Sequence, residues 1–157
     1  EDAEVIVHGA SWQEANTYAQ SLIDAATAFF HPFDDPLAWD GHSTLVDEVA
    51  ATGLRPDAVV LSVGGGGLLR GVALGMRRHG WDDVPIVAVE TEGAASYRAA
   101  IEAGGPVEIA RISSVATSLG ARRVCEAAWR WSRTVGLYGH LETPGMEGVD
   151  QGRIQLQ

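Results

Sequence analysis

The sequence contains no lysine, so all 11 of its basic side chains are arginines. Proteins that hold an aldehyde cofactor as a Schiff base use a lysine amine for that bond. Arginine cannot replace lysine in this role, because its guanidinium group stays protonated and planar. These 157 residues therefore contain no side chain that could form such a bond.

Cysteine is scarce, and long apolar runs are missing. The single cysteine, Cys125, cannot form a disulfide within the chain, which favours a reducing compartment. No apolar run approaches the roughly 20 residues that cross a membrane. The first residues show no signal-peptide pattern either. We therefore expect a cytoplasmic protein that does not interact with membranes.

Basic residues are also few: 11 arginines stand against 21 acidic residues, which gives a formal net charge of -10. Nucleic-acid binding depends on arginine and lysine neutralising phosphates, so a nucleic-acid partner is disfavoured. We interpret the negative charge as a solubility charge. The hydrophobic content of 46% is ordinary for a globular domain with one buried core.

Short apolar runs alternate with helical patterns along the chain. Ser11 and Glu14 form a capping-box pattern at the start of the first helix, and Pro32 and Pro36 indicate a loop after it. The predicted strands are residues 4–8, 57–63 and 85–90, and the predicted helices are 12–28, 42–51, 68–79, 94–103 and 121–134. This alternation predicts an α/β fold with a mostly parallel sheet and flanking helices.

We assign residues 1–135 to one α/β core and residues 136–157 to an irregular glycine-rich tail. The first residue is Glu1 rather than methionine, and the first predicted strand follows almost at once. We therefore expect that an N-terminal part precedes this sequence.

A run of four glycines, Gly64 to Gly67, lies between a predicted buried strand and a helix. Unpaired amides and the helix dipole favour an anion there, and glycines allow the backbone to close on a phosphate. The alternative is a tight turn without a ligand, for which four glycines are more than we expect. The P-loop pattern is excluded because no lysine follows.

The dinucleotide pattern G-x-G-x-x-G is not met either, because Leu69 or Arg70 stands where the third glycine belongs. Glu90 ends the next strand about 20 residues further on, as an acidic residue does in dinucleotide-binding domains. A nucleotide-binding domain therefore stays open as an alternative.

Four segments together resemble the serine/threonine dehydratases, which belong to the fold type II (tryptophan-synthase-β-like) group of pyridoxal-phosphate enzymes. In chain order they are residues 31–42 (HPFDDPLAWDGH), 62–69 (SVGGGGLL), 89–96 (VETEGAAS) and 114–120 (SVATSLG). The resemblance covers roughly residues 3 to 134 and implies a partial fold type II architecture.

The resemblance implies two binding roles for this chain. The cofactor phosphate would be held by the backbone amides of Gly64, Gly65, Gly66, Gly67 and Leu68. A hard cation such as K⁺, Mg²⁺ or Ca²⁺ would be bound by the Glu90 side chain and by backbone carbonyls. Those carbonyls belong to Gly64, Ala94, Leu119 and Ala121.

The resemblance also implies deamination of L-serine or L-threonine to a 2-oxo acid and ammonia. The family's Schiff-base lysine and substrate-carboxylate loop lie in an earlier segment, and the residue that contacts the pyridine nitrogen lies in a later one. No catalytic residue is therefore assigned within this chain, and its activity alone is not expected. We expect either a homo-oligomer or a complementing fragment as partner.

Two other functions remain open. The chain could be a non-catalytic fragment that binds phosphate or the cofactor. It could also be a cofactor-independent hydrolase, since residues 41–45 (GHSTL) are similar to the Gly-x-Ser-x-Gly elbow around a nucleophilic serine. Leu45 replaces the last glycine and no strand precedes Ser43, so we favour a helix start. We expect Cys125 to be a buried hydrophobe and Trp81, beside a loop, to be partly exposed.

Overall fold

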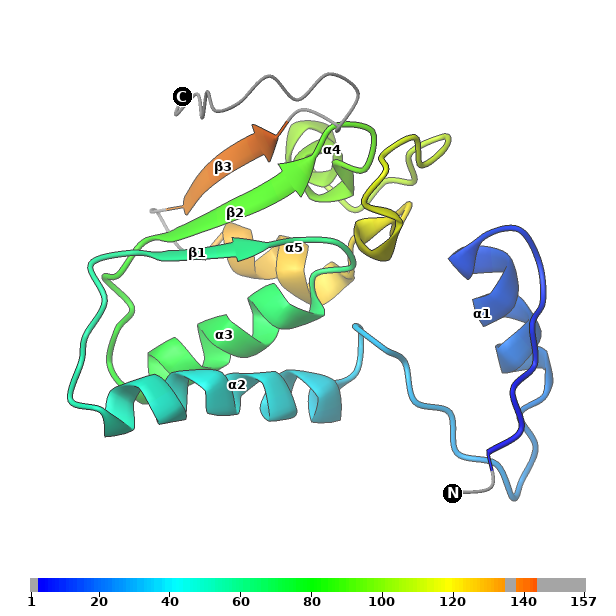
Figure 1. Cartoon of the computed structure of the whole chain (residues 1–157), viewed down its shortest axis with the longest axis horizontal. Helices are drawn as coiled ribbons and strands as arrows, with labels where there is room; N and C mark the ends of the chain where they lie inside the picture. Colours follow the sequence, from blue (N-terminus) through cyan, green and yellow to red (C-terminus); the bar gives the residue numbers. More distant parts are fainter. Residues whose placement is uncertain (1–2, 135–137, 144–157) are drawn as a thin grey trace. The chain divides into compact units, whose positions relative to one another are not determined.

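The computed structural model describes residues 3–134 and 138–143 (Figure 1). The chain divides into two compact units, Glu1–Phe30 and His31–Gln157, a division that the sequence did not indicate. In the described residues, no helix has the length and apolar character that crossing a bilayer requires.

The described residues of the first unit form one helix, α1 (Trp12–Ser21). The Ser11 hydroxyl accepts a hydrogen bond from the Glu14 amide at 3.3 Å, which confirms the predicted helix start. The helix is shorter than predicted. After it, the Asp24 carboxylate accepts hydrogen bonds from the Ala26 amide and the Thr27 hydroxyl, and such local bonds compete with helix continuation.

The predicted strand at residues 4–8 is not found. Val5 and Val7 are 83% and 91% exposed, and no strand among the described residues pairs with this segment. The prediction of a buried strand was wrong, because an apolar run becomes a strand only when a neighbouring strand supplies the ladder of hydrogen bonds.

The second unit contains a parallel three-stranded sheet in the order β1 (Val59–Ser62), β2 (Ile86–Thr91) and β3 (Tyr138–Thr143). Val59 is in register with Ile86, which in turn is in register with Tyr138. The first two strands confirm the predicted parallel α/β sheet.

The third strand corrects the prediction of an irregular tail from residue 136 onward. Residues 138–143 pair with β2 along its whole length. This short segment contains a glycine and polar residues, so its pattern does not predict a strand, and pairing with β2 makes it one. Residues 144–157, the rest of the predicted tail, lie outside the described part of the chain.

In its described residues the second unit has four α-helices and one short 3-10 helix, Thr117–Leu119. The α-helices are α2 (Pro36–Ala51), α3 (Gly67–Arg78), α4 (Ser96–Ala103) and α5 (Glu126–Ser132). The start of α2 was predicted six residues too late. The Asp35 carboxylate caps the helix by accepting from the Leu37 amide at 2.8 Å. Pro36 then occupies the first turn, where proline is tolerated because that amide has no helical partner.

Helix α5 is shorter than predicted because the Cys125 amide leaves the helical pattern and donates to the Gly65 carbonyl at 2.9 Å. Cys125 is buried, as predicted, at 4% exposure. Trp81 is also buried, at 8%, so the prediction of partial exposure was wrong. The Trp81 ring belongs to the main core, which encloses it although a loop follows.

Helices α2 and α3 lie side by side in Figure 1, beneath the sheet in that view. Glycines in α3 allow this close approach. A Cβ at Gly75 would stand 2.6 Å from the Ser43 carbonyl oxygen and 2.7 Å from the Val46 Cβ. Helix α2 therefore packs closely on the helix that follows the glycine run.

Candidate functional site

The glycine run forms the turn from the carboxyl end of β1 into α3. Gly66 has φ +93°, a left-handed conformation that suits glycine, and no side chain caps the helix. The first amides of a helix have no partner within the helix, so this end of α3 presents unpaired donors. The arrangement agrees with the geometry of an anion-binding turn.

The chain's own side chains crowd this turn. The Phe33 ring lies against Gly65, where an added Cβ would overlap it. A Cβ at Gly67 would stand 2.8 Å from the Phe33 Cα. Phe33 was not singled out in the sequence, although it lies in one of the four family-like segments.

The other two glycines of the run are also closely approached. A Cβ at Gly66 would stand 2.7 Å from the Ala128 Cβ, and one at Gly64 would stand 3.1 Å from the Leu119 Cα. A side chain at Gly65, Gly66 or Gly67 would force neighbouring atoms to move, and Gly64 is tightly but less severely approached. Packing thus supplies a second reason for glycine at three of the four positions, beside the predicted phosphate binding, which stays a prediction.

His31 holds the segment that carries Phe33. Its Nδ1 atom accepts a hydrogen bond from the Asp34 amide at 2.9 Å, and its ring meets the Phe33 ring edge-on at 4.6 Å between centroids. Burial lowers the pKa of His31, although Asp34 and Asp35 oppose that effect. The neutral imidazole is the form that can accept the Asp34 amide.

Glu90 lies in β2 and is completely buried. Its two carboxylate oxygens accept hydrogen bonds from the amides of Tyr97, at 2.8 Å, and Arg98, at 2.9 Å. The carboxylate therefore caps the first turn of α4, a role that the sequence did not reveal.

The structure brings together some of the predicted cation ligands. The Leu119 carbonyl oxygen would lie 3.1 Å from a Cβ at Gly64, so these two residues are neighbours. The Leu119 carbonyl also accepts from the Ala121 amide at 2.9 Å, and the Ala94 carbonyl accepts from the Ser96 amide at 3.1 Å.

Ser96 was not predicted to take part, but its hydroxyl oxygen is buried and has no hydrogen-bond partner within the described residues. Leaving a buried hydroxyl unsatisfied costs about 1–3 kcal/mol. An unsatisfied oxygen two residues after Ala94 fits a region that accommodates an oxygen-ligated cation.

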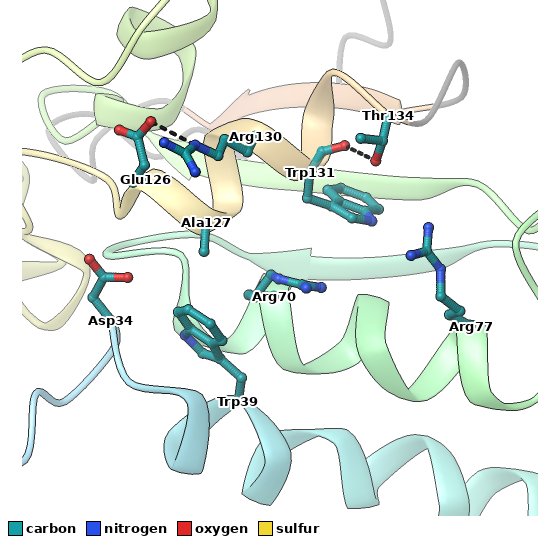
Figure 2. A pocket seen from close by; sticks show the side chains of 9 residues that line it. All are labelled: Asp34, Trp39, Arg70, Arg77, Glu126, Ala127, Arg130, Trp131 and Thr134. Atoms are coloured by element: carbon teal, nitrogen blue, oxygen red, sulfur yellow. Dashed lines mark hydrogen bonds and ion pairs between the residues drawn. The ribbon is translucent and has the colours of Figure 1, made fainter.

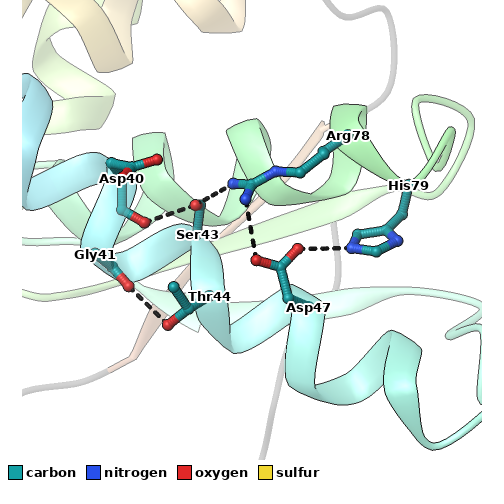
Figure 3. Close-up of polar contacts among 7 residues, drawn as sticks. All are labelled: Asp40, Gly41, Ser43, Thr44, Asp47, Arg78 and His79. Carbon is teal, nitrogen blue, oxygen red and sulfur yellow. Dashed lines mark hydrogen bonds and ion pairs between the residues drawn. The ribbon is translucent and has the colours of Figure 1, made fainter.

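Ser43 is not placed as a catalytic nucleophile would be (Figure 3). It is buried within α2, donates to the Asp40 carbonyl at 2.6 Å and accepts from the Arg78 guanidinium. Asp47 binds Arg78 at 3.0 Å and His79 at 2.7 Å. These residues join α2 to the end of α3. An elbow needs a serine exposed on a sharp strand-to-helix turn.

The comparisons with known proteins agree with this geometry. A family model described as "Pyridoxal-phosphate dependent enzyme" matches residues 1–142. An L-serine dehydratase of Dictyostelium discoideum is 41% identical over 173 residues, covering 100% of this chain and 49% of the relative. A serine dehydratase-like protein of Mus musculus is 52% identical over 126 residues, covering 79% of this chain and 38% of the relative. The chain thus spans about half of these relatives or less.

Two solved structures share the fold. A fungal L-serine ammonia-lyase from Rhizomucor miehei superimposes with a TM-score of 0.75 at 33% identity, covering 88% of this chain and 43% of that one. The processed form of threonine deaminase isoform 2 from Solanum lycopersicum gives a TM-score of 0.77 at 27% identity, covering 88% of this chain and 40% of that one. The partial fold type II architecture inferred from the four segments is confirmed.

Proposed function

The chain belongs to the pyridoxal-phosphate dependent enzyme family, and on this premise we propose that it supplies the phosphate-binding and cation-binding part of an L-serine/L-threonine ammonia-lyase. The observation that carries the proposal is the uncapped start of α3 directly behind the glycine turn. The amides of Gly64, Gly65, Gly66, Gly67 and Leu68 would hold the cofactor phosphate there.

The net reaction would convert L-serine into pyruvate and ammonia. The amino acid loses its Cα proton and its β-hydroxyl as water, and one water is regained when the C–N bond is hydrolysed, so no oxidant is needed. Bound pyridoxal phosphate would supply an electron sink for the charge left at Cα. This chain has no lysine to bond the cofactor or move the proton, so that amine has to come from another segment.

The cation would be K⁺, Mg²⁺ or Ca²⁺, bound by the Glu90 carboxylate and by the carbonyls of Gly64, Ala94, Leu119 and Ala121. Support comes from the buried carboxyl group of Glu90 and from the Ser96 hydroxyl, which has no hydrogen-bond partner among the described residues. Since Glu90 also caps α4, the cation would link the end of β2 to the glycine turn.

The phosphate role is tested by changing the ligand rather than the loop, because a side chain at any of the four glycines would disturb packing. Pyridoxamine phosphate and pyridoxamine differ only in the phosphate, and neither can react with the Glu1 amine. We expect calorimetric titration to show at least about tenfold tighter binding of the phosphorylated ligand, or about 1.4 kcal/mol. Equal affinity for the two would overturn the proposal.

The ammonia-lyase role is tested by complementation. The part of the Dictyostelium relative that this chain does not match would be produced separately and mixed with the chain. We expect pyruvate from L-serine only in the mixture, and none from either part alone. A complementing part whose cofactor lysine is changed to alanine is the matched control. Pyruvate formation with that control would exclude the proposed division of roles.

A second candidate function, a partner-dependent half without activity of its own, is favoured by the free side of β1. Val60 on this strand is 65% exposed, and β1 pairs only with β2 among the described residues. An apolar groove of about 390 Å³ lies beside it, with Leu45, Val49 and Val72 among its lining residues. Large exposed apolar surfaces of this kind mark interaction sites.

Association is measured by sedimentation velocity with and without the complementing part. We expect Val60→Glu to weaken the complex, because it places a charge in the apolar groove. The control Leu54→Glu changes another exposed apolar residue, which does not line the groove. A chain that sediments as a monomer both with and without the complementing part would contradict this candidate and the expected homo-oligomer.

A further inference from the structure

A pocket of about 440 Å³ opens between α2, α3 and α5, and none of the four glycines lines it (Figure 2). Trp39 lines it from α2, Arg70 and Arg77 from α3, and Arg130 and Trp131 from α5. The volume suits a small organic molecule. Two indoles and three guanidinium groups in one pocket are unusual for a chain with a net charge of -10.

Of the three arginines in this pocket, Arg70 is the one without an ion pair among the described residues. Arg77 pairs with Asp82 at 3.3 Å and Arg130 pairs with Glu126 at 2.9 Å. In the part of the chain that the structure describes, Arg70 forms no ion pair with a carboxylate. Partial burial lowers the pKa of Arg70, and the charge of Arg77 lowers it further. A partly desolvated cation without a counter-ion is costly, and a bound anion would relieve that cost.

The indoles provide flat apolar walls beside this charge. The Arg70 guanidinium lies 5.7 Å from the centroid of the Trp39 ring. Trp39 is fixed in place because its Nε1 donates to the Phe33 carbonyl at 2.9 Å. Figure 2 shows the Trp131 indole projecting from α5 on the other side of the pocket. Rigid aromatic walls favour a planar ligand, which can stack on them.

We propose that this pocket binds a small planar anion, an aromatic or heteroaromatic ring that carries one carboxylate or phosphate group. The ring would lie against Trp39 and Trp131, and the anionic group would pair with Arg70. Asp34 and Glu126 also line the pocket, and their charge disfavours ligands with several anionic groups. The site lies along the flank of α3. Binding there would be a separate role from the proposed ammonia-lyase function.

Calorimetric titration of the intact 157-residue chain tests the proposal with two matched ligand pairs. AMP is compared with adenosine, and phenylacetate with phenylacetamide, so that each pair differs in the anionic group. We expect saturable binding of at least one anion, at least about tenfold tighter than its neutral partner. The pair that responds distinguishes a nucleotide from an aromatic carboxylate. No saturable binding by either anion would overturn the proposal.

Two variants test whether the anion binds at Arg70. Arg70→Gln is expected to abolish the preference for the anion, whereas Arg55→Gln, which removes an exposed arginine that does not line the pocket, should leave it unchanged. Unfolding midpoints in urea verify that both variants fold, and Arg70→Met, which also removes the charge, replaces Arg70→Gln if the latter does not. If the anion binds Arg70→Gln with unchanged affinity, it does not pair with Arg70 and the proposal fails.

Discussion

The Phe33 ring lies directly over the backbone of Gly65, so that a side chain at residue 65 would overlap it. The turn proposed to hold a phosphate is thus closed on one side by an aromatic residue of the same chain. Phe33 is in turn held by His31, whose ring meets its edge. The glycine turn and residues 31–35 therefore form one packing unit, and changes in either should affect the other.

A double-mutant cycle measures this coupling. We expect Gly65→Ala to destabilise the native chain by about 1–3 kcal/mol, since overpacking forces neighbouring groups to move. In a Phe33→Ala background the same change should cost at least about 1 kcal/mol less, because the overlapping ring is gone. Urea unfolding provides the four free energies. Gly105→Ala is the control, since a Cβ there meets no atom within 4 Å.

Glu90→Gln should destabilise the protein by about 1–3 kcal/mol, because an amide can accept with only one of its two ends and the start of α4 loses one of its two bonds. Glu92→Gln, at an exposed position two residues away, should cost little. Thermal unfolding compares the two variants. Equal stability of the two would contradict the capping role.

The same pair tests the cation. Potassium chloride should raise the unfolding temperature of the unchanged chain, compared with tetramethylammonium chloride at equal ionic strength. It should do the same for the Glu92→Gln variant, which keeps Glu90. In Glu90→Gln this difference should vanish. A potassium effect that survives in Glu90→Gln would place any cation elsewhere.

His31 should make stability depend on pH on the acidic side. Its pKa is lowered below the ordinary 6.5 in the folded chain, so the unfolded state binds the proton more readily. Stability should therefore fall as pH decreases below about 6.5 and through the lower folded pKa. Urea midpoints between pH 7 and pH 5 measure the slope, which should be smaller in His31→Gln. An identical slope in the two would refute the assignment.

Cys125 should resist alkylation in the folded chain, because burial raises its pKa from 9.0 to about 11. A thiol-reactive reagent at pH 8 should label it far faster in urea than in buffer. Above pH 9 the unfolded thiol loses its proton first, so stability should decline as pH rises from 9 toward 11. In Cys125→Ala this part of the decline should be absent, and its persistence would show that other groups cause it.

The sequence was sufficient for the elements around the glycine turn. β1, α3 and β2 lie within three residues of the predicted ranges, since their apolar periods and glycine stops are local signals. The family was also recognisable from four ordered segments. The missing lysine is a property of composition alone, and it determines that no side chain of these 157 residues can form the cofactor bond.

Tertiary structure decided what depends on distant partners. Residues 138–143 are a strand because β2 pairs with them, and residues 4–8 are not, because no described strand does. Glu90 caps a helix because the fold places the Tyr97 and Arg98 amides of α4 beside its carboxylate. Among the described residues Arg70 forms no ion pair, and α2 and α5 bring the indoles of Trp39 and Trp131 into its pocket. Pairing, burial and charge neutralisation arise between residues far apart in the chain, which local periodicity cannot encode.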